Sequence, residues 1–277
     1  MWGKSALTLA MIDSARARGI DVMADVYPYT ATHTGISVLV PSWALADGDS
    51  AFARRTRDRV LRDSITRGII FNILNDRGGG ELRRVQFSRV SWDRTLEGRT
   101  LADWATRRAL PPTPETGARL VIEAILNGGA NAIYHVLDEG DVRRIMRHPA
   151  SMVASDGRLS TPGDGHPHPR AYGTFPRVLG HYARDERVLT LEQAVHKMSG
   201  MPAARLGLTD RGVLREGAAA DVLVFDARRV ADRATFARPH QYAMGIDYVF
   251  VNGVAAVDRG RFMDRRAGRV LRRTSRR

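Results

Sequence analysis

Residues 5–29, SALTLAMIDSARARGIDVMADVYPY, carry the pattern that decides the fold class. Apolar side chains recur near helical spacing over residues 5–18, and Gly19 stands where a glycine commonly ends a helix. Residues 20–29 form a β-rich run broken by Pro28, which predicts a short buried strand leading into a loop. A helix, a glycine and a buried strand in this order are typical of an α/β fold with parallel strands.

The same order returns later in the chain. Residues 114–127 predict a helix, and two glycines separate it from the β-like residues 131–137. Residues 138–147 predict a further helix with Asp138 as its N-cap, and residues 151–157 a strand that ends in a polar turn. These repeats extend the expected α/β scaffold.

Two other stretches depart from this scaffold. Residues 41–112 are long, arginine-rich and weakly periodic, which favours an insertion that folds over a site. Residues 212–226 suggest a short strand, a turn and an apolar strand. Residues 246–257 suggest a hairpin, because Asn252-Gly253 is a strong signal for a type I′ turn. A small β-domain is therefore expected after the α/β part.

The composition is that of a globular protein. The 277 residues are 43% hydrophobic and 26% charged, and no apolar run approaches the roughly 20 residues that cross a bilayer. The chain has no cysteine, which excludes disulfides and thiolate metal ligands within it and suits a cytoplasmic location.

The net charge of +13 raises the question of a nucleic-acid partner. Nearly all of the positive charge is arginine spread along the chain, with one dense tail after Asp264 that is expected to fray. No basic stripe interleaved with aromatic residues is present, and no helix-turn-helix or RNA-binding signature is found either. Solvated basic faces are therefore the favoured interpretation, with no nucleic-acid and no membrane partner.

Asp156 is the most suggestive single residue. It follows the predicted strand over residues 151–157, and parallel α/β barrels place catalytic groups at the carboxyl ends of their strands. A carboxylate there can take a proton from a metal-bound water or ligate the metal itself. From position alone, a structural role as the cap of the following turn is the commoner outcome.

Other candidates lie near the same strand ends. His166 and His168 form an H-x-H pair, but each precedes a proline, so a stiff loop is favoured over a metal-binding strand. Arg170 follows on that loop, and its planar fork suits a substrate carboxylate. A hydroxyl from Tyr27 or Tyr29 would reach the same rim. His33 and His135 are also near strand ends, and structural roles are favoured for both.

Three segments resemble the N-acyl-D-amino-acid deacylase (D-aminoacylase) family of the amidohydrolase superfamily. Residues 25–31, DVYPYTA, are similar to its D-x-Y-P-Y motif. Residues 155–157, SDG, with residues 166–182, HPHPRAYGTFPRVLGHY, are similar to its S-D-G and H-P-R-x-x-G-T-F-P-R-V-L-G stretch. Residues 215–226, REGAAADVLVFD, look like the closing β-sandwich segment of amidohydrolases. The resemblance covers essentially the whole chain.

This resemblance implies a function and a site. The family hydrolyses N-acyl-D-amino acids to a carboxylate and a D-amino acid with a metal-activated water. Asp156 matches its general base and later acid, and Tyr27 and Arg170 match residues that bind the substrate α-carboxylate. The family fold is a (β/α)8 TIM barrel with a small β-sandwich. It implies a barrel portion over residues 1–205 with an insertion at about 36–130, a sandwich portion over 206–264 and a basic tail over 265–277.

The metal ligands that the family implies are not found. Its zinc is held by an H-x-H strand, a cysteine and two further histidines, which are expected upstream of Met1, so no metal ligand is predicted here and Asp156 is only a weak candidate. The family's carboxylate-binding lysine also precedes the W-G-K-S segment, so Lys4 does not match it. The chain is thus expected to be a C-terminal portion that binds zinc poorly and has little turnover alone.

The sequence is also compatible with two other functions. A cyclic-amide hydrolase of the dihydroorotase or hydantoinase kind would share the barrel and Asp156 without needing the carboxylate contacts of Tyr27 and Arg170. A non-catalytic basic fragment is the other. The stretch from Arg158 to Gly165 is also a few residues longer than the family pattern, which affects the placement of Arg170.

Overall fold

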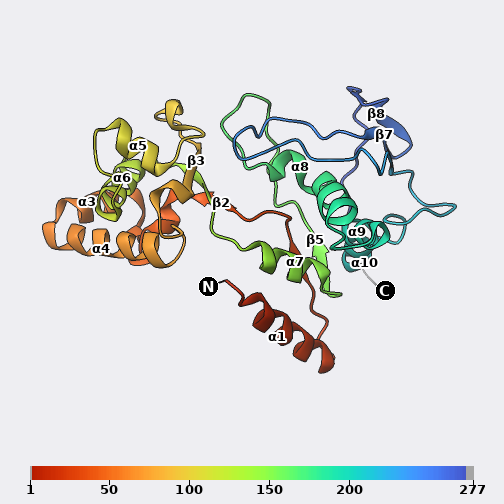
Figure 1. Cartoon of the computed structure of the whole chain (residues 1–277), viewed down its shortest axis with the longest axis horizontal. Helices are drawn as coiled ribbons and strands as arrows, with labels where there is room; N and C mark the ends of the chain where they lie inside the picture. The colour runs from red at the N-terminus through yellow and green to blue at the C-terminus, as the bar shows by residue number, and fades with distance from the viewer. Residues whose placement is uncertain (1, 273–277) are drawn as a thin grey trace. The chain divides into compact units, whose positions relative to one another are not determined.

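The computed structural model describes residues 2–272, which form two compact units (Figure 1). The first unit contains residues up to Pro28, Glu139–Arg158 and the chain from Pro169 onward. The second contains Tyr29–Asp138 and Leu159–His168. The chain therefore passes from one unit to the other and back twice.

The first unit begins with helix α1 (Ser5–Ala17), which confirms the expected helix. Strand β1 (Ala24–Val26) follows and pairs in parallel with β5 (Ser151–Val153), after helix α7 (Glu139–Arg147). The parallel pairing confirms the expected α/β order. The prediction of a buried first strand is wrong, because Ala24 and Val26 are only half-buried and Asp25 is exposed. Within the described residues this sheet has two strands, too few to enclose its members.

Several helices follow β5 in the first unit. They are α8 (Arg170–Arg177), a π-helix (Val178–Asp185), α9 (Leu191–Met198) and α10 (Gly200–Leu206). Val153 of β5 packs with side chains of α7, the π-helix and α9 in one apolar cluster. Lys197 of α9 is buried and donates hydrogen bonds from Nζ to the carbonyl oxygens of His148 (2.6 Å) and Ser151 (2.7 Å). This lysine therefore holds the start of β5.

An antiparallel sheet closes the first unit. Its strand order is β6 (Val222–Phe225), β7 (Ile246–Val251), β8 (Val254–Asp258) and β9 (Arg261–Phe262). Asn252 and Gly253 both have positive φ, 49° and 82°, as a type I′ turn requires, so the predicted hairpin is confirmed. The strand predicted at the start of residues 212–226 is wrong. Gly212 has φ of 83° and the exposed Val213 and Leu214 make no ladder.

The second unit contains an antiparallel sheet of order β2 (Thr32–Gly35), β4 (Asn131–Tyr134) and β3 (Val85–Arg89). Residues 131–137 had been expected to continue the parallel α/β order, and this is wrong, because β4 runs antiparallel to both neighbours. Gly128 and Gly129 both adopt positive φ, 101° and 81°, before the strand. Glycines with positive φ commonly end helices before strands of either direction, as Gly19 does before β1, so this pair gives no signal of the antiparallel order.

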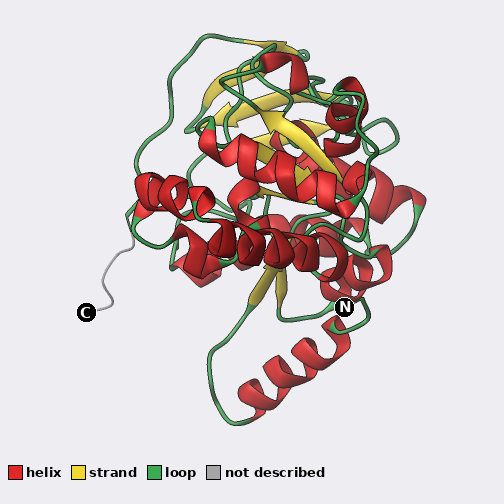
Figure 2. Ribbon diagram, turned by 90° about the vertical axis from the view of Figure 1, so that its left-hand side faces the viewer, coloured by secondary structure: helices red, strands yellow, loops and turns green. Residues whose placement is uncertain are grey.

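The second unit has more helix than strand. Figure 2 colours the helices of the described chain red and its strands yellow. The helices of the second unit are α2 (Ser42–Leu45), α3 (Gly48–Arg57), α4 (Arg59–Asn75), α5 (Leu101–Arg107) and α6 (Pro114–Leu126), with 3-10 turns at Ile36–Leu39, Leu82–Arg84 and Arg94–Leu96. The helix expected at 114–127 is thus confirmed as α6. The stretch that had looked weakly periodic supplies much of a large apolar core, including Phe52, Ile65, Ile69 and Trp104.

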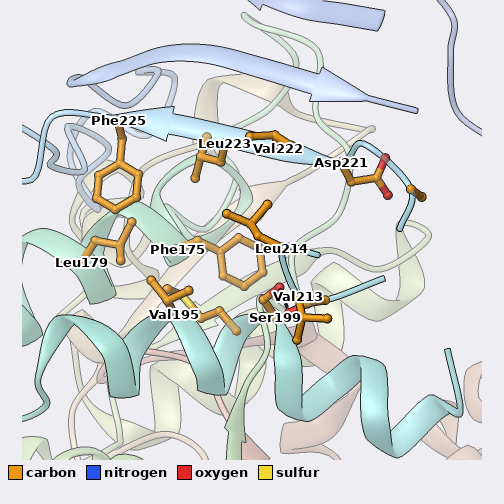
Figure 3. Close-up of a pocket in the computed structure, with 13 residues that line it drawn as sticks. Phe175, Leu179, Val195, Ser199, Val213, Leu214, Asp221, Val222, Leu223 and Phe225 are labelled. Atoms are coloured by element: carbon orange, nitrogen blue, oxygen red, sulfur yellow. Dashed lines mark hydrogen bonds between the residues drawn. The ribbon is translucent and has the colours of Figure 1, made fainter. Parts of the chain in front are cut away.

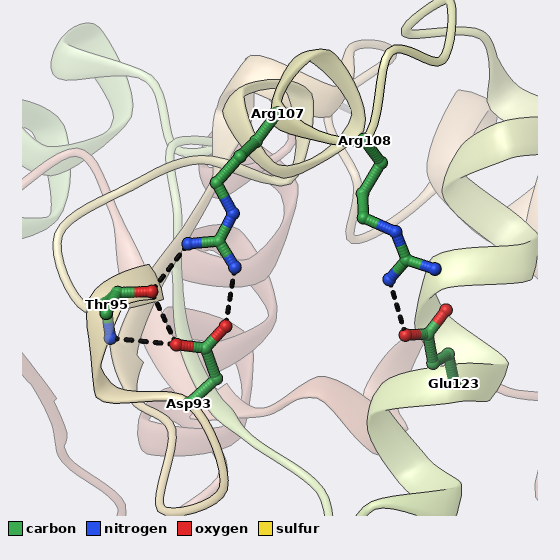
Figure 4. A network of polar contacts seen from close by, with 5 residues as sticks. All are labelled: Asp93, Thr95, Arg107, Arg108 and Glu123. Carbon is green, nitrogen blue, oxygen red and sulfur yellow. Dashed lines mark hydrogen bonds and ion pairs between the residues drawn. The ribbon is translucent and has the colours of Figure 1, made fainter.

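Charged side chains fasten the surface loop before α5 (Figure 4). Asp93 accepts hydrogen bonds from the backbone N–H of Thr95 (3.1 Å) and from Arg107 (2.6 Å). The Thr95 hydroxyl, followed by Arg107, holds the pKa of Asp93 below its usual value. Arg108 pairs with Glu123 of α6 at 2.7 Å. These contacts join the loop, α5 and α6.

The domain boundaries stay predictions. The expected insertion at about 36–130 falls within the second unit, whose bounds are wider. Residues 265–272 of the expected basic tail form no helix or strand, and residues 273–277 lie outside the described residues. Within the described chain, no helix is both long and apolar enough to cross a membrane.

Candidate functional site

The parallel pair β1–β5 sets two of the predicted site residues at one edge. Val26 lies opposite Val153, and the Ala154 N–H donates to the Val26 carbonyl at 3.1 Å. Tyr27 directly follows β1, and Asp156 follows β5 by three residues. Because parallel strands end at the same edge, both residues leave the sheet on the same side.

A tight turn then presents Asp156. Its φ is 46°, in the left-handed region that aspartate tolerates better than most residues. The Gly157 N–H donates to the Ser155 hydroxyl at 3.2 Å, so Ser155 caps this turn. A Cβ on Gly157 would lie 2.9 Å from the Arg170 carbonyl oxygen, which shows how closely the turn approaches α8. The side chain of Asp156 is 66% exposed and is available to a ligand.

Arg170 joins Asp156 to Tyr27. Its side chain is 5% exposed and pairs through Nη2 with Oδ2 of Asp156 at 2.8 Å. Its guanidinium carbon lies 4.7 Å from the centre of the Tyr27 ring. The structure thus brings together the three residues predicted as the site, while their roles stay predictions.

The expected position of Arg170 on a stiff extended loop is wrong, since it is the first residue of α8. Pro169 before it has φ of −57° and ψ of −18°, and this helical geometry lets a proline lead into a helix. Beginning a helix fixes the backbone of Arg170 more firmly than a loop would.

The two histidines of the H-x-H pair have other neighbours, all within the second unit. His166 Nε2 lies 3.3 Å from Gln86 Nε2, and Gln86 Oε1 lies 3.0 Å from His135 Nε2. His168 is buried, with Nε2 3.0 Å from the carbonyl oxygen of Ala31. The pair is on a loop rather than a strand, as expected.

The remaining tyrosine and histidine candidates also lie in the second unit. Tyr29 is buried with its ring 5.2 Å from that of His168. Tyr27 is therefore the tyrosine that accompanies Arg170. His33 is in β2. Burial, and then the charge of Arg84, lower the pKa of His135, which favours its neutral form.

The described residues do not provide a complete set of metal ligands. Over residues 2–272, no group of three or more His, Cys, Asp or Glu side chains is arranged to hold a metal ion. Asp156 is the one predicted site residue with a carboxylate, and its partner is Arg170. The residues present therefore do not fit a zinc site by themselves.

Two positions that matter to the site were not anticipated from sequence. Gly157 permits the close approach of the Asp156 turn to α8, and Lys197 fixes the start of β5. Lys197 is one of only two lysines in an arginine-rich chain, and this was an available signal for it. Nothing in the sequence gave the partner atoms of Gly157, because they lie more than ten residues away.

An apolar cavity of about 570 Å³ lies elsewhere in the first unit (Figure 3). Side chains from α8, the π-helix, α9 and β6 face it, among them Phe175, Leu179, Val195 and Leu223. It includes none of Tyr27, Asp156 and Arg170. The cavity is therefore separate from the cluster around Arg170.

The sequence matches known proteins along most of its length. Residues 84–257 match the Amidohydrolase family. The chain belongs to the amidohydrolase family. It is 41% identical over 275 residues to an N-acyl-D-glutamate deacylase from Alcaligenes xylosoxydans xylosoxydans, and 37% identical over 286 residues to a D-aminoacylase from that organism. These matches cover 98% and 99% of this chain and 46% of each relative.

Solved amidohydrolases have a similar structure. A crystal structure of D-aminoacylase matches with a TM-score of 0.74 at 37% identity, over 98% of this chain and 47% of that one. N-acyl-D-glutamate deacylase from Bordetella bronchiseptica, solved with zinc and a phosphonate inhibitor, matches with a TM-score of 0.70 at 36% identity, over 92% and 44%. The predicted resemblance and the mixed α/β class are confirmed. The chain spans about half the length of these relatives.

Proposed function

We propose that the protein of which this amidohydrolase chain is part hydrolyses N-acyl-D-amino acids to a carboxylate and a free D-amino acid. The observation that carries the proposal is the convergence of Asp156, Arg170 and Tyr27 at one edge of the β1–β5 pair. Relatives named as deacylases of N-acyl-D-amino acids support it. A (β/α)8 barrel with a small β-sandwich is the corresponding proposal for the complete fold.

The chemistry proposed for these residues follows from their surroundings. Arg170 is buried and permanently charged, so it can accept a substrate α-carboxylate in a bidentate pair at little cost in side-chain entropy. Tyr27 lies under the guanidinium, where its ring stabilises the cation and its hydroxyl can donate to the same carboxylate.

Asp156 is the proposed proton carrier. Its exposed carboxylate can take a proton from the attacking water as the new C–O bond forms. It can then return that proton to the amide nitrogen as the C–N bond breaks, which leaves a neutral amine. A substrate carboxylate bound at Arg170 would place the scissile amide near this group.

Zinc is the metal we propose for the whole protein, because a similar deacylase was solved with zinc. The described residues alone do not form its site, so none of the steps above is assigned to it. The 277-residue chain alone is expected to bind zinc substoichiometrically and to show little turnover. Equilibrium dialysis with zinc and a deacylation assay on this chain test that expectation, and stoichiometric zinc with clear turnover would contradict it.

A hybrid protein tests this function. In the 41%-identical N-acyl-D-glutamate deacylase, the region that this chain matches is replaced by this chain, and the first half of that deacylase is kept. We expect release of acetate from N-acetyl-D-glutamate, little from the L-enantiomer and no opening of a hydantoin. Hydantoin opening that survives Arg170→Ala would instead favour a cyclic-amide hydrolase. A DNA mobility shift at physiological salt would favour a basic binding module, and none is expected.

A further inference from the structure

The chain between Asp156 and Arg170 is anchored on the second unit. Residues Leu159–His168 belong to that unit, although the residues on either side belong to the first. Within the second unit, the His166 N–H donates to the Ser88 carbonyl at 2.7 Å, and Arg89 pairs with Asp164. This anchored segment ends at His168, two residues before Arg170.

His168 is the most deeply held residue of that segment. It is 2% exposed, and its Nε2 lies 3.0 Å from the carbonyl oxygen of Ala31. A carbonyl only accepts hydrogen bonds, so Nε2 carries the proton and donates it. The Tyr29 ring meets the imidazole edge-on, with centroids 5.2 Å apart. His168 therefore fastens its own stretch of chain to residues 29–31.

The two stretches joined by His168 are those that carry the carboxylate site. Residues 29–31 follow Tyr27 by two to four positions, and Arg170 follows His168 by two. The intervening Pro169 is buried, with a φ fixed by its ring, so little slack separates His168 from Arg170. A movement of residues 29–31 relative to His168 would therefore change the distance between the Arg170 guanidinium and the Tyr27 ring.

We propose that His168 is a positioning residue that holds Arg170 over Tyr27 through its hydrogen bond to Ala31. His168 is not one of the three residues of the proposed site. The effect of His168 on ligand binding rests on the proposed function, whereas its effect on the position of Arg170 does not. A role in packing alone would need the ring but not its N–H. The hydrogen bond and the packing can therefore be separated by substitution.

The first measurement is independent of any ligand. NMR hydrogen exchange of the Arg170 Nε–H in the 277-residue chain reports how firmly the guanidinium is held. His168→Phe keeps a ring beside Tyr29 and removes the donor, and should speed this exchange about tenfold, the upper range for one lost hydrogen bond. His168→Gln restores a donor and should return exchange to within about twofold of wild type. His196→Phe, at an exposed histidine of α9, should change nothing.

The second measurement uses N-acetyl-D-alanine and its carboxamide, which differ only in the carboxylate. NMR titration of the chain should show that His168→Phe lowers the preference for the carboxylate by about tenfold. In an Arg170→Ala background the same change should have no further effect, because His168 acts through Arg170. If His168→Phe fails to fold, His168→Asn, whose shorter amide falls short of Ala31, takes its place.

The outcomes separate the two proposals. Three results would each overturn the positioning role. The Arg170 Nε–H could exchange at the wild-type rate in His168→Phe or His168→Asn, or His168→Gln could fail to restore slow exchange. The carboxylate preference could also fall as much in the Arg170→Ala background as in the wild-type chain. A wild-type chain that binds the carboxamide as well as the carboxylate would count against the proposed function instead. Arg170 exchange would still decide the role of His168 in that case.

Discussion

Gly157→Ala is expected to disturb the site by simple contact. The added Cβ would lie 2.9 Å from the Arg170 carbonyl oxygen and 3.2 Å from the Ala171 Cα. Both are backbone atoms at the start of α8, so neither can rotate away, and the turn and the helix must separate by a few tenths of an ångström. Overpacking of this kind costs about 1–3 kcal/mol. Gly157 does not have a positive φ, so the cost is steric rather than conformational.

Amide hydrogen exchange of peptides from β5 and α8 measures this cost within the first unit. Their opening free energy should fall by about 1–3 kcal/mol in Gly157→Ala. The preference for N-acetyl-D-alanine over its carboxamide should fall as well, because the start of α8 moves and displaces the Arg170 guanidinium from its position over the Tyr27 ring. Gly268→Ala is the matched control, since nothing lies within 4 Å of its Cβ and its φ is not positive. Equal opening energies in Gly157→Ala and Gly268→Ala would refute the close approach.

Three further changes test other parts of the account. Arg170→Lys keeps the charge but loses one of two charge-assisted hydrogen bonds to the carboxylate. The carboxylate preference in the same NMR titration should therefore weaken by about 1.5–3 kcal/mol. An unchanged preference would exclude a bidentate contact. Lys197→Met removes the Nζ donor from the buried Ser151 carbonyl, whereas the His148 carbonyl keeps the Ser151 N–H. It should lower the opening free energy of β5 by about 1–3 kcal/mol in hydrogen exchange. The pKa of Asp93 is lowered by Thr95 and then Arg107, so its contribution to stability is present above the unfolded pKa and is lost as pH falls through the folded one. Urea unfolding followed by tryptophan fluorescence from pH 6 to 3 should show this loss, and Asp93→Asn should remove that part of the pH dependence.

The scaffold of the first unit was largely accessible from local sequence. The helix α1 and the turn at Asn252-Gly253 depend on contacts a few residues apart, which spacing and turn chemistry report directly. The convergence of Tyr27 and Asp156 followed from the rule that parallel strands end at one edge. Arg170 needed the family resemblance, because a single arginine in an arginine-rich chain carries no signal of its own.

What escaped prediction depends on contacts that are distant in sequence. In α4 the buried residues Ile65, Ile69 and Ile73 are spaced by four, but arginines and polar residues between them weakened the periodic signal. The antiparallel pairing of β4 is set by strands whose paired residues lie 42 to 102 positions away in the sequence. Gly157 likewise meets its partner across thirteen residues. The spacing of apolar residues indicates which face of a segment is buried, but it does not indicate which distant segment covers that face.

The most direct measurement of the central claim is the effect of Asp156→Asn on amide hydrolysis. It is made in the protein that joins this chain to the first half of N-acyl-D-glutamate deacylase. Asparagine tolerates the positive φ of this position and keeps the side-chain shape, so the change removes the proton carrier with little strain. We predict that acetate release from N-acetyl-D-glutamate falls about 10²- to 10⁴-fold while the substrate still binds at Arg170. Turnover by the Asn variant at the unsubstituted rate would contradict the assignment of Asp156 as the proton carrier.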